Sequence, residues 1–212
     1  MKLRAIFTLI LIYTACYISA QDFFAGPVLG ASFTQVDGDS YAGFNKAGLK
    51  VGGFVGRSLS DLWDVQMEII YIQKGSRKTP DVKKGDYADY SIQLDYIQFP
   101  LIARYKLNKF SFEGGASYGV LLNSVEKVNG DLIPEDSRVP FQKNELASIF
   151  SVNYQITDRL KINARYSYSL YRIRIPYNGE IPIYDPYWDR RKPGQYNHVV
   201  NFSFYYNLFQ NY

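Results

Sequence analysis

The chain contains a single histidine, His198, so catalysis of the serine-hydrolase type would depend on it. Such a site needs a hydroxyl nucleophile that passes its proton to the histidine, and a carboxylate that orients the ring. Ser203 follows in the same segment, but an extended strand points it to the face opposite His198, and no carboxylate is close in the sequence. The pattern favours a histidine at a strand rim and leaves a lipid A hydrolase as the weaker alternative.

Four charged residues occupy strand positions that predict a shared interior. Asn108 and Lys109 form a two-residue turn, and antiparallel pairing across it places Arg104 opposite Glu113. Both side chains would point inward, where an ion pair compensates charges that an occluded interior could not hold singly. Glu68 and Arg165 are candidates to join this pair. We expect a plug of charged side chains, and a path for protons or ions is the alternative.

The segment from Arg172 to Asn197 combines prolines with aromatic and cationic side chains and should form an exposed loop. Aromatic faces beside guanidinium groups could bind glycans, lipopolysaccharide phosphates or a protein partner. The alternative is that the aromatic rings pack on each other and on the rim of the fold. The binding candidates are Tyr184, Tyr187, Trp188, Arg190 and Arg191.

A second group of cations could lie over anionic lipid headgroups or belong to a solvated loop; its members are Lys74, Arg77, Lys78, Lys83 and Lys84. Metal and cofactor chemistry has little support in the sequence. The chain lacks a cluster of histidines and cysteines that could hold zinc, and its carboxylates are too scattered to specify calcium. We therefore predict neither a cofactor nor a metal.

Two segments show the period-two alternation of a strand with one apolar face. From Leu160 to Leu170 and from Val200 to Leu208, apolar and polar residues alternate, and the parity of the second segment continues to Tyr212. Similar patterns predict further strands near residues 65–71, 110–122 and 146–156. Less regular candidates cover residues 23–35, 46–58 and 92–107, the last interrupted by Pro100, which gives eight strands in all.

The connections between these strands alternate in length. Short turns near Ser60, Asn108 and Asp158 separate four long loops, at about residues 36–45, 74–91, 123–144 and 172–197. This arrangement is typical of a transmembrane β-barrel with short periplasmic turns and long extracellular loops. We therefore predict an all-β fold: an eight-stranded antiparallel up-and-down barrel whose apolar half faces lipid while its polar half fills the inside.

A soluble up-and-down barrel would show the same alternation with the two faces reversed. The polar face opposes this alternative because it is rich in Gly, Ser and Asn, which suit the narrow interior of an eight-stranded barrel. Tyrosines also recur near the ends of the apolar faces, as in interfacial girdles: Tyr71, Tyr105, Tyr154 and Tyr168.

The 212 residues, 47% of them hydrophobic, suffice for one domain. Met1 to Ala20 has a basic start, a short apolar core and small terminal residues, which predicts an export signal peptide and a single barrel domain over residues 21–212. Losing Lys2 and Arg4 with this leader would lower the formal net charge of +4 by two, so nucleic acid is not an expected partner. The alternative is lipoprotein processing at Cys16, the only cysteine.

The segment Leu94–Tyr105, with the sequence LDYIQFPLIARY, resembles the strand signature of the PorT-type family of outer-membrane β-barrels. The glycine-rich segment Phe112–Leu122 is similar to the strand that follows it in that family. The resemblance implies an eight-stranded barrel in the outer membrane of a Gram-negative bacterium. It also suggests, as one alternative, a component of a secretion apparatus of the gliding or type IX kind.

The last strand ends on an aromatic residue and looks like the signal that the barrel assembly machinery reads; its outward residues are Phe204, Tyr206, Leu208 and Tyr212. Taken together, these patterns predict a non-enzymatic outer-membrane barrel with a filled polar interior, which acts in structure, adhesion or partner binding through its extracellular loops. Expected partners are outer-membrane lipid or lipopolysaccharide and the assembly machinery, with a surface or secretion protein as an alternative.

Overall fold

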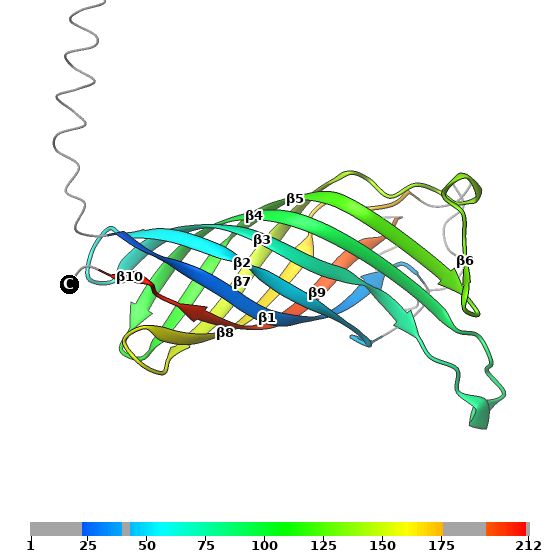
Figure 1. The fold of residues 1–212 in the computed structure, drawn as a ribbon, viewed down its shortest axis with the longest axis horizontal. Helices are drawn as coiled ribbons and strands as arrows, with labels where there is room; N and C mark the ends of the chain where they lie inside the picture. Colours follow the sequence, from blue (N-terminus) through cyan, green and yellow to red (C-terminus); the bar gives the residue numbers. More distant parts are fainter. Residues whose placement is uncertain (1–22, 40–42, 176–193, 211–212) are drawn as a thin grey trace, which may run out of the picture.

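The computed structural model describes residues 23–39, 43–175 and 194–210. Within these ranges the chain forms eight long antiparallel strands, each paired with the next, and the last pairs with the first to close a barrel (Figure 1). The predicted fold class is confirmed. The strands are β1 (Phe23–Asp37), β2 (Lys46–Ser58), β3 (Trp63–Lys78), β4 (Tyr90–Leu107), β5 (Phe110–Val128), β7 (Asn144–Gln155), β8 (Leu160–Ser169) and β9 (Tyr196–Tyr206).

Short elements complete the fold. The two-residue strand β6 (Asp131–Leu132) pairs with the C-terminal end of β5, and β10 (Phe209–Gln210) pairs with the start of β1. Two single 3₁₀ turns lie in the long connections, η2 (Val82–Lys84) and η3 (Glu135–Ser137). None of the helices in the described part of the chain is long and apolar enough to span a membrane.

The two ends of the barrel differ as the alternating connections predict. The short turns between β2 and β3, β4 and β5, and β7 and β8 lie at one end, together with the start of β1 and with β10 (Figure 1). The long connections lie at the other end. We call these the short-turn end and the long-loop end.

Several strands are longer than the sequence pattern predicts. β3 continues to Lys78 and β5 to Val128. The first residues of the expected loops 74–91 and 123–144 are therefore paired strand. A tilted membrane-spanning strand needs only about 9–11 residues, so β3, β4 and β5 project well beyond a bilayer. The sequence conceals these extensions because a strand above the membrane has no need of an apolar outer face.

The β4–β5 pairing places Leu107 opposite Phe110 and Arg104 opposite Glu113, in the register expected from the turn. Asn108 takes the left-handed conformation that this turn requires, with φ of 54°. The strand runs through Pro100 without a shift in register, and the irregularity lies instead at Asp95 and Tyr96. The predicted interruption at Pro100 is therefore only local: β4 continues through it, while the pairing with β3 lapses at Phe99 and Pro100, because a proline removes one donor of the ladder but leaves an extended backbone intact.

The sequence pattern predicts that the last strand keeps one parity to its end, and this prediction is wrong. β9 stops at Tyr206, and after Asn207 and Leu208 the pairing with β1 resumes in β10 with its register moved by one residue. The amide of Leu208 donates to the carbonyl of Ala25 across this break. Leu208 and Phe209 are both exposed, which is the result expected where one extra residue enters a strand.

The two faces of the wall differ in exposure as the alternation predicts. In β8 the inward residues Lys161, Asn163 and Arg165 are buried, whereas Ile162 and Tyr166 are exposed. The most exposed outward side chains of the other strands are large and apolar, for example Leu29, Met67, Ile69, Leu101, Phe150 and Phe202.

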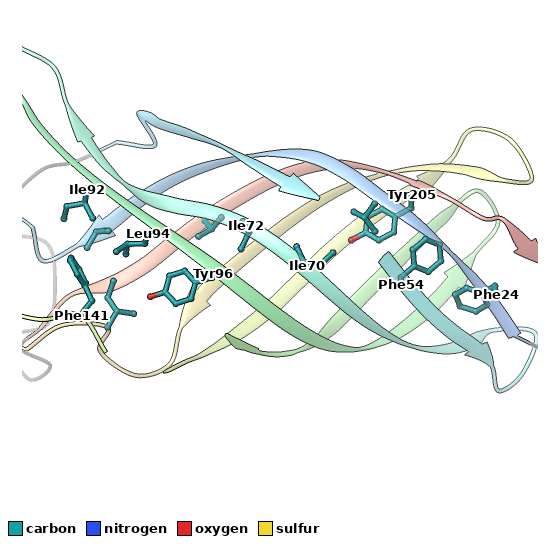
Figure 2. Close-up of a cluster of buried hydrophobic side chains, with 13 residues drawn as sticks. Phe24, Phe54, Ile70, Ile72, Ile92, Leu94, Tyr96, Phe141 and Tyr205 are labelled. Atoms are coloured by element: carbon teal, nitrogen blue, oxygen red, sulfur yellow. The ribbon is translucent and has the colours of Figure 1, made fainter. Parts of the chain in front are cut away.

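The interior is not uniformly polar, which corrects the expectation that apolar residues only face lipid. Two groups of buried apolar side chains point inward (Figure 2). Phe24, Phe54 and Tyr205 lie towards the short-turn end. The larger group towards the long-loop end includes Ile72, Ile92, Leu94, Tyr96, Phe141 and Ile173. Polar and charged residues fill the space between and around these groups.

Candidate functional site

Arg104 is the first centre of an ion-pair network inside the barrel. Its Nε donates to Glu113 Oε1 at 2.8 Å and its Nη1 to Asp64 Oδ2 at 3.4 Å, while Nη2 donates to Gln66 Oε1. The side chains of Arg104 and Glu113 are 3% and 0% exposed. Because Asp64, Arg104 and Glu113 come from β3, β4 and β5, this guanidinium joins three adjacent strands.

Arg165 is the second centre and binds Glu68 in a bidentate manner across the barrel. Nη1 lies 2.7 Å from Glu68 Oε2 and Nη2 lies 2.9 Å from Oε1. Nη2 also donates to Glu113 Oε2 at 3.1 Å, and Nε donates to Ser151 Oγ at 3.0 Å. Paired charge-assisted bonds of this geometry fix both partners in orientation as well as in distance.

The structure therefore brings together the four interior residues singled out from the sequence. Glu113 is the shared member, since it accepts from Arg104 with one oxygen and from Arg165 with the other. The network connects β3, β4, β5 and β8 across the lumen. Glu68 and Arg165 lie on strands that are not neighbours, so their contact follows from the diameter of the barrel and not from the pairing register.

Three aromatic rings pack beside this network, with Arg104 over the Phe24 ring and Arg165 over the Tyr205 ring. The Tyr205 hydroxyl donates to Glu68 Oε1 at 3.0 Å, and its ring packs against Phe54, which in turn packs against Phe24. The ammonium group of Lys161 lies 5.3–5.7 Å from the centres of all three rings. Cation–π contacts of this kind hold a charge that has little access to water.

A second buried ion pair lies nearer the long-loop end. Lys74 Nζ donates to Glu145 Oε2 at 2.5 Å, and Glu145 also accepts from Ser169, Asn197 and Gln98. The expectation that Lys74 belongs to a loop, either over lipid headgroups or in solvent, is wrong. Lys74 is an inward residue of β3, and nothing in the strand register links it to Glu145, which lies on β7.

The long-loop end of the lumen is closed by apolar side chains from two connections. Phe141 precedes β7 and Ile173 follows β8, and the amide of Gln142 donates to the carbonyl of Ile173. Glu126 holds this cap in place, because Arg174 Nη2 lies 3.0 Å from its Oε2 and Arg138 Nη1 lies 3.7 Å from the same oxygen. We call Phe141, Ile173, Glu126, Arg138 and Arg174 the mouth cap.

Two cavities lie among the described residues of the lumen and its long-loop end. A cavity of about 10 Å³ lies among Lys50, Ile70, Ser117 and Arg165, room for about one water-sized species. A larger groove of about 260 Å³ lies beside the mouth cap, between the C-terminal part of β5 and the chain leading to β7. The barrel interior is thus packed with side chains, as expected for eight strands.

The family model for the outer membrane protein beta-barrel domain matches residues 19–173, well over half of the chain. The chain belongs to this family. It is an outer-membrane β-barrel, so its apolar outer face lies in lipid and its closed wall satisfies the backbone hydrogen bonds there.

Among solved structures, the outer-membrane barrel is similar in fold to Ail, the attachment invasion locus protein of Yersinia pestis. The identity is 15%, with a TM-score of 0.50, over 89% of this chain and 99% of that one. It is also similar to Neisserial surface protein A, NspA, with 13% identity and a TM-score of 0.50 over 88% and 97% of the two chains. At these identities the likeness shows the fold alone. No curated protein sequence matches the chain.

Aromatic pairs mark both edges of the lipid-facing surface of the outer-membrane barrel. At the short-turn end, Trp63 packs against Tyr105 and Phe110 against Tyr154, each pair with ring centres 5.1 Å apart. Towards the long-loop end Tyr168 stacks on Tyr196 at 6.0 Å. Aromatic side chains are favoured at the two membrane–water interfaces, which places the bilayer between these pairs.

His198 lies on the outer face of β9, near the long-loop end. Its ring contacts Phe44, Tyr166 and Tyr168, and its Nδ1 lies 3.6 Å from Asp37 Oδ1. Ser203 is buried on the inner face of the same strand, so the wall separates it from His198. The structure gives His198 an aromatic surrounding at the rim of the outer-membrane barrel and no contact with Ser203.

Other residues singled out from the sequence are distributed as follows. Phe204, Tyr206 and Leu208 are exposed on the outer face of the last strand, and Tyr212 lies outside the described residues. The loop candidates Tyr184, Tyr187, Trp188, Arg190 and Arg191 also lie outside the described residues, as do residues 1–20, the predicted signal peptide, which include Cys16. Among the described residues, no group of three or more His, Cys, Asp or Glu side chains could hold a metal ion.

Proposed function

We propose that this outer-membrane barrel is a non-enzymatic surface protein that binds a partner through its long-loop end. The binding surface consists of the four long connections, with the loop over residues 172–197 as its main part. The partner class that fits the aromatic and arginine side chains of that loop is an anionic glycan, which includes the phosphorylated sugars of lipopolysaccharide.

The observation that carries this proposal is the closed interior. Arg104, Arg165, Glu68 and Glu113 occupy the lumen with their charges paired, and Phe141 and Ile173 cover its mouth. The described part of the lumen therefore offers a solute no continuous path. A partner would bind the exposed loops instead. The extension of β3, β4 and β5 beyond the membrane raises the β3–β4 connection and the start of the β5–β7 connection above the lipid surface.

Binding of the full chain in lipid nanodiscs to lipopolysaccharide and to dextran sulfate tests this proposal. Replacing Tyr184, Tyr187, Trp188, Arg190 and Arg191 together by alanine should abolish binding. The control replaces Lys83 and Lys84, which lie at the tip of the β3–β4 connection, by glutamine and should leave most of the binding intact. Equal binding by the loop variant, or no binding of either probe by the unmodified chain, would contradict the proposal.

The family resemblance of Leu94–Tyr105 supports a second candidate, a PorT-like component of a secretion apparatus of the gliding or type IX kind. Here the periplasmic turns or the outer wall would contact other proteins of the apparatus. Isolation of intact complexes from outer-membrane fractions separates the two candidates. Recovery of a defined set of secretion proteins with the tagged chain supports the second, and recovery of the barrel alone opposes it.

The proposal includes a route to the membrane. Residues 1–20 would direct export in a Gram-negative cell, and the terminal strand with Phe204, Tyr206, Leu208 and Tyr212 would be read by the barrel assembly machinery. Deleting residues 210–212 should then lower the surface level of the protein. Normal surface levels after this deletion would oppose the assignment of the terminal strand.

A further inference from the structure

The buried charges near the short-turn end do not balance. Within the described ranges this layer holds four buried cations, Lys50, Arg104, Lys161 and Arg165, but its three buried carboxylates are Asp64, Glu68 and Glu113. The one further cation that touches them, Lys106, lies at the edge with its side chain 33% exposed, and it adds to the positive excess. With both buried lysines protonated, the layer therefore carries at least one positive charge in excess.

The two arginines take all three carboxylates. Arg104 pairs with Glu113 and Asp64, and Arg165 pairs with Glu68 and Glu113. Among the described residues, neither buried lysine has a carboxylate within ion-pairing distance. Lys161 has the three aromatic rings described above, whereas Lys50 has one hydrogen bond to the Tyr205 hydroxyl at 3.3 Å and lies over the same ring. An ammonium group held this way inside a membrane protein is costly.

The small interior cavity lies beside this lysine. Its polar lining consists of Lys50, Arg165, Gln98, Ser117, Ser167 and Asn201, so it contains two cations and no carboxylate. Ser117 is 1% exposed, and its hydroxyl has no hydrogen-bond partner within the described part of the chain. The cavity thus combines excess positive charge, an unused hydroxyl donor and room for about one small species.

We propose that this cavity holds one small monovalent anion of the size of chloride, bound by the Lys50 ammonium and the Ser117 hydroxyl. The anion neutralises the excess charge of the layer and supplies Ser117 with an acceptor. A water molecule is the competing occupant, since it would also satisfy the Asn201 Oδ1 atom, which lacks a donor. With water in the cavity, however, Lys50 must either stay charged without a counter-ion or lose its proton, whereas an anion balances the ammonium in a lumen enclosed by wall and lipid.

Crystals of the full chain refolded in sodium bromide test the identity of the occupant directly. Because the lumen is closed, the anion has to be present during folding. We expect an anomalous bromine peak inside the barrel next to Lys50, and its loss in Lys50→Met. Interior density without an anomalous signal, or bromine peaks at the protein surface only, would overturn the proposal.

Unfolding by urea in lipid vesicles gives an independent readout. After refolding in sodium chloride or in sodium gluconate of equal ionic strength, wild type should unfold at higher urea in chloride, because an ion that binds only the folded state stabilises it. Lys50→Met should fold in both salts and lose this difference, and Ser117→Ala should reduce it. Lys109→Met removes a cation from an exposed turn and should keep it. An equal chloride effect in wild type and Lys50→Met contradicts the site.

Discussion

The two halves of the barrel interior are closed by different physical means. Near the short-turn end, two arginines and three carboxylates interlock, and each guanidinium spans several strands. Near the long-loop end, apolar side chains of β3 and β4 pack beneath Phe141 and Ile173, which come from the connections. The first closure is built into the wall itself, whereas the second depends on loops that fold over the mouth.

This difference predicts different consequences of damage. A broken ion pair within the lipid-spanning region leaves a buried charge without a partner, so the whole barrel loses stability. A weakened mouth cap exposes a local segment to water and leaves the paired strands intact. The closure near the short-turn end should therefore control global unfolding, and the closure near the long-loop end should control local opening.

The largest effect is expected from Arg165→Met. This change leaves Glu68 without its bidentate partner and should lower the free energy of unfolding by about 3–5 kcal/mol. Urea titrations of the protein in lipid vesicles would measure the loss. Adding Glu68→Gln should restore part of the stability, because the uncompensated charge is then removed. Wild-type stability in the single variant would show that the ion-pair network does not stabilise the half of the barrel near the short-turn end.

A smaller loss is expected from Ile72→Ala in the apolar half. Ile72 is 1% exposed, and its truncation leaves a cavity that should cost about 2–4 kcal/mol. Ile69→Ala, on the lipid-facing side of the same strand, creates no internal cavity and serves as the control with a smaller loss. The same titrations report both variants. Equal losses at the two positions would contradict tight packing of the apolar group towards the long-loop end.

Glu126→Gln tests the mouth cap. Arg138 and Arg174 would lose their shared carboxylate, at a local cost of about 1.5 kcal/mol, which corresponds to roughly tenfold more frequent opening. Trypsin should then cut after Arg138 or Lys143 about ten times faster, while the midpoint of global unfolding stays the same. Glu135→Gln, at an 81% exposed side chain, is the matched control and should change the rate little. A large fall in global stability would mean that the two closures are not separate.

The smallest effect concerns the tip of the β3–β4 connection, outside both closures. The hydrogen bond from Lys78, followed by that from the Ala88 amide, lowers the pKa of Asp86 below its usual 3.8. Because the folded-state pKa is the lower one, this stabilisation is present above about pH 4 and is lost as the pH falls through the folded-state pKa. Hydrogen exchange at Ala88, corrected for the intrinsic rate, should show less protection at pH 2.5 than at pH 5. Asp86→Asn should remove this pH dependence.

Strand alternation and turn length suffice to predict the strands, their orientation and the register of one pair. In β8 and β9 the outward residues are apolar or aromatic except for His198, and most inward residues are polar, so both strands and their orientation follow from the sequence. The two-residue turn at Asn108 fixed the register that places Arg104 opposite Glu113. Such predictions succeed where only neighbouring strands and one bilayer-facing side are involved.

The remaining features depend on contacts that alternation does not specify. Ile69 to Ile72 is apolar on both faces, so its parity does not reveal that Ile70 and Ile72 fill the lumen. Lys74 follows in a polar stretch that reads as loop, because β3 has left the lipid there, and its partner Glu145 lies across the barrel. The extra residue near Asn207 shifts the last strand without a clear signal in the sequence.

The central claim is that the interior is closed along its length, so that function resides at the exposed loops. Current through planar bilayers containing the refolded full chain tests it most directly. With a closed interior, no steady conductance above that of the bare membrane is expected at moderate voltage. Stable, reproducible open-channel steps in the unmodified protein would contradict it, since they require a continuous aqueous path past Arg165, Glu68 and the mouth cap.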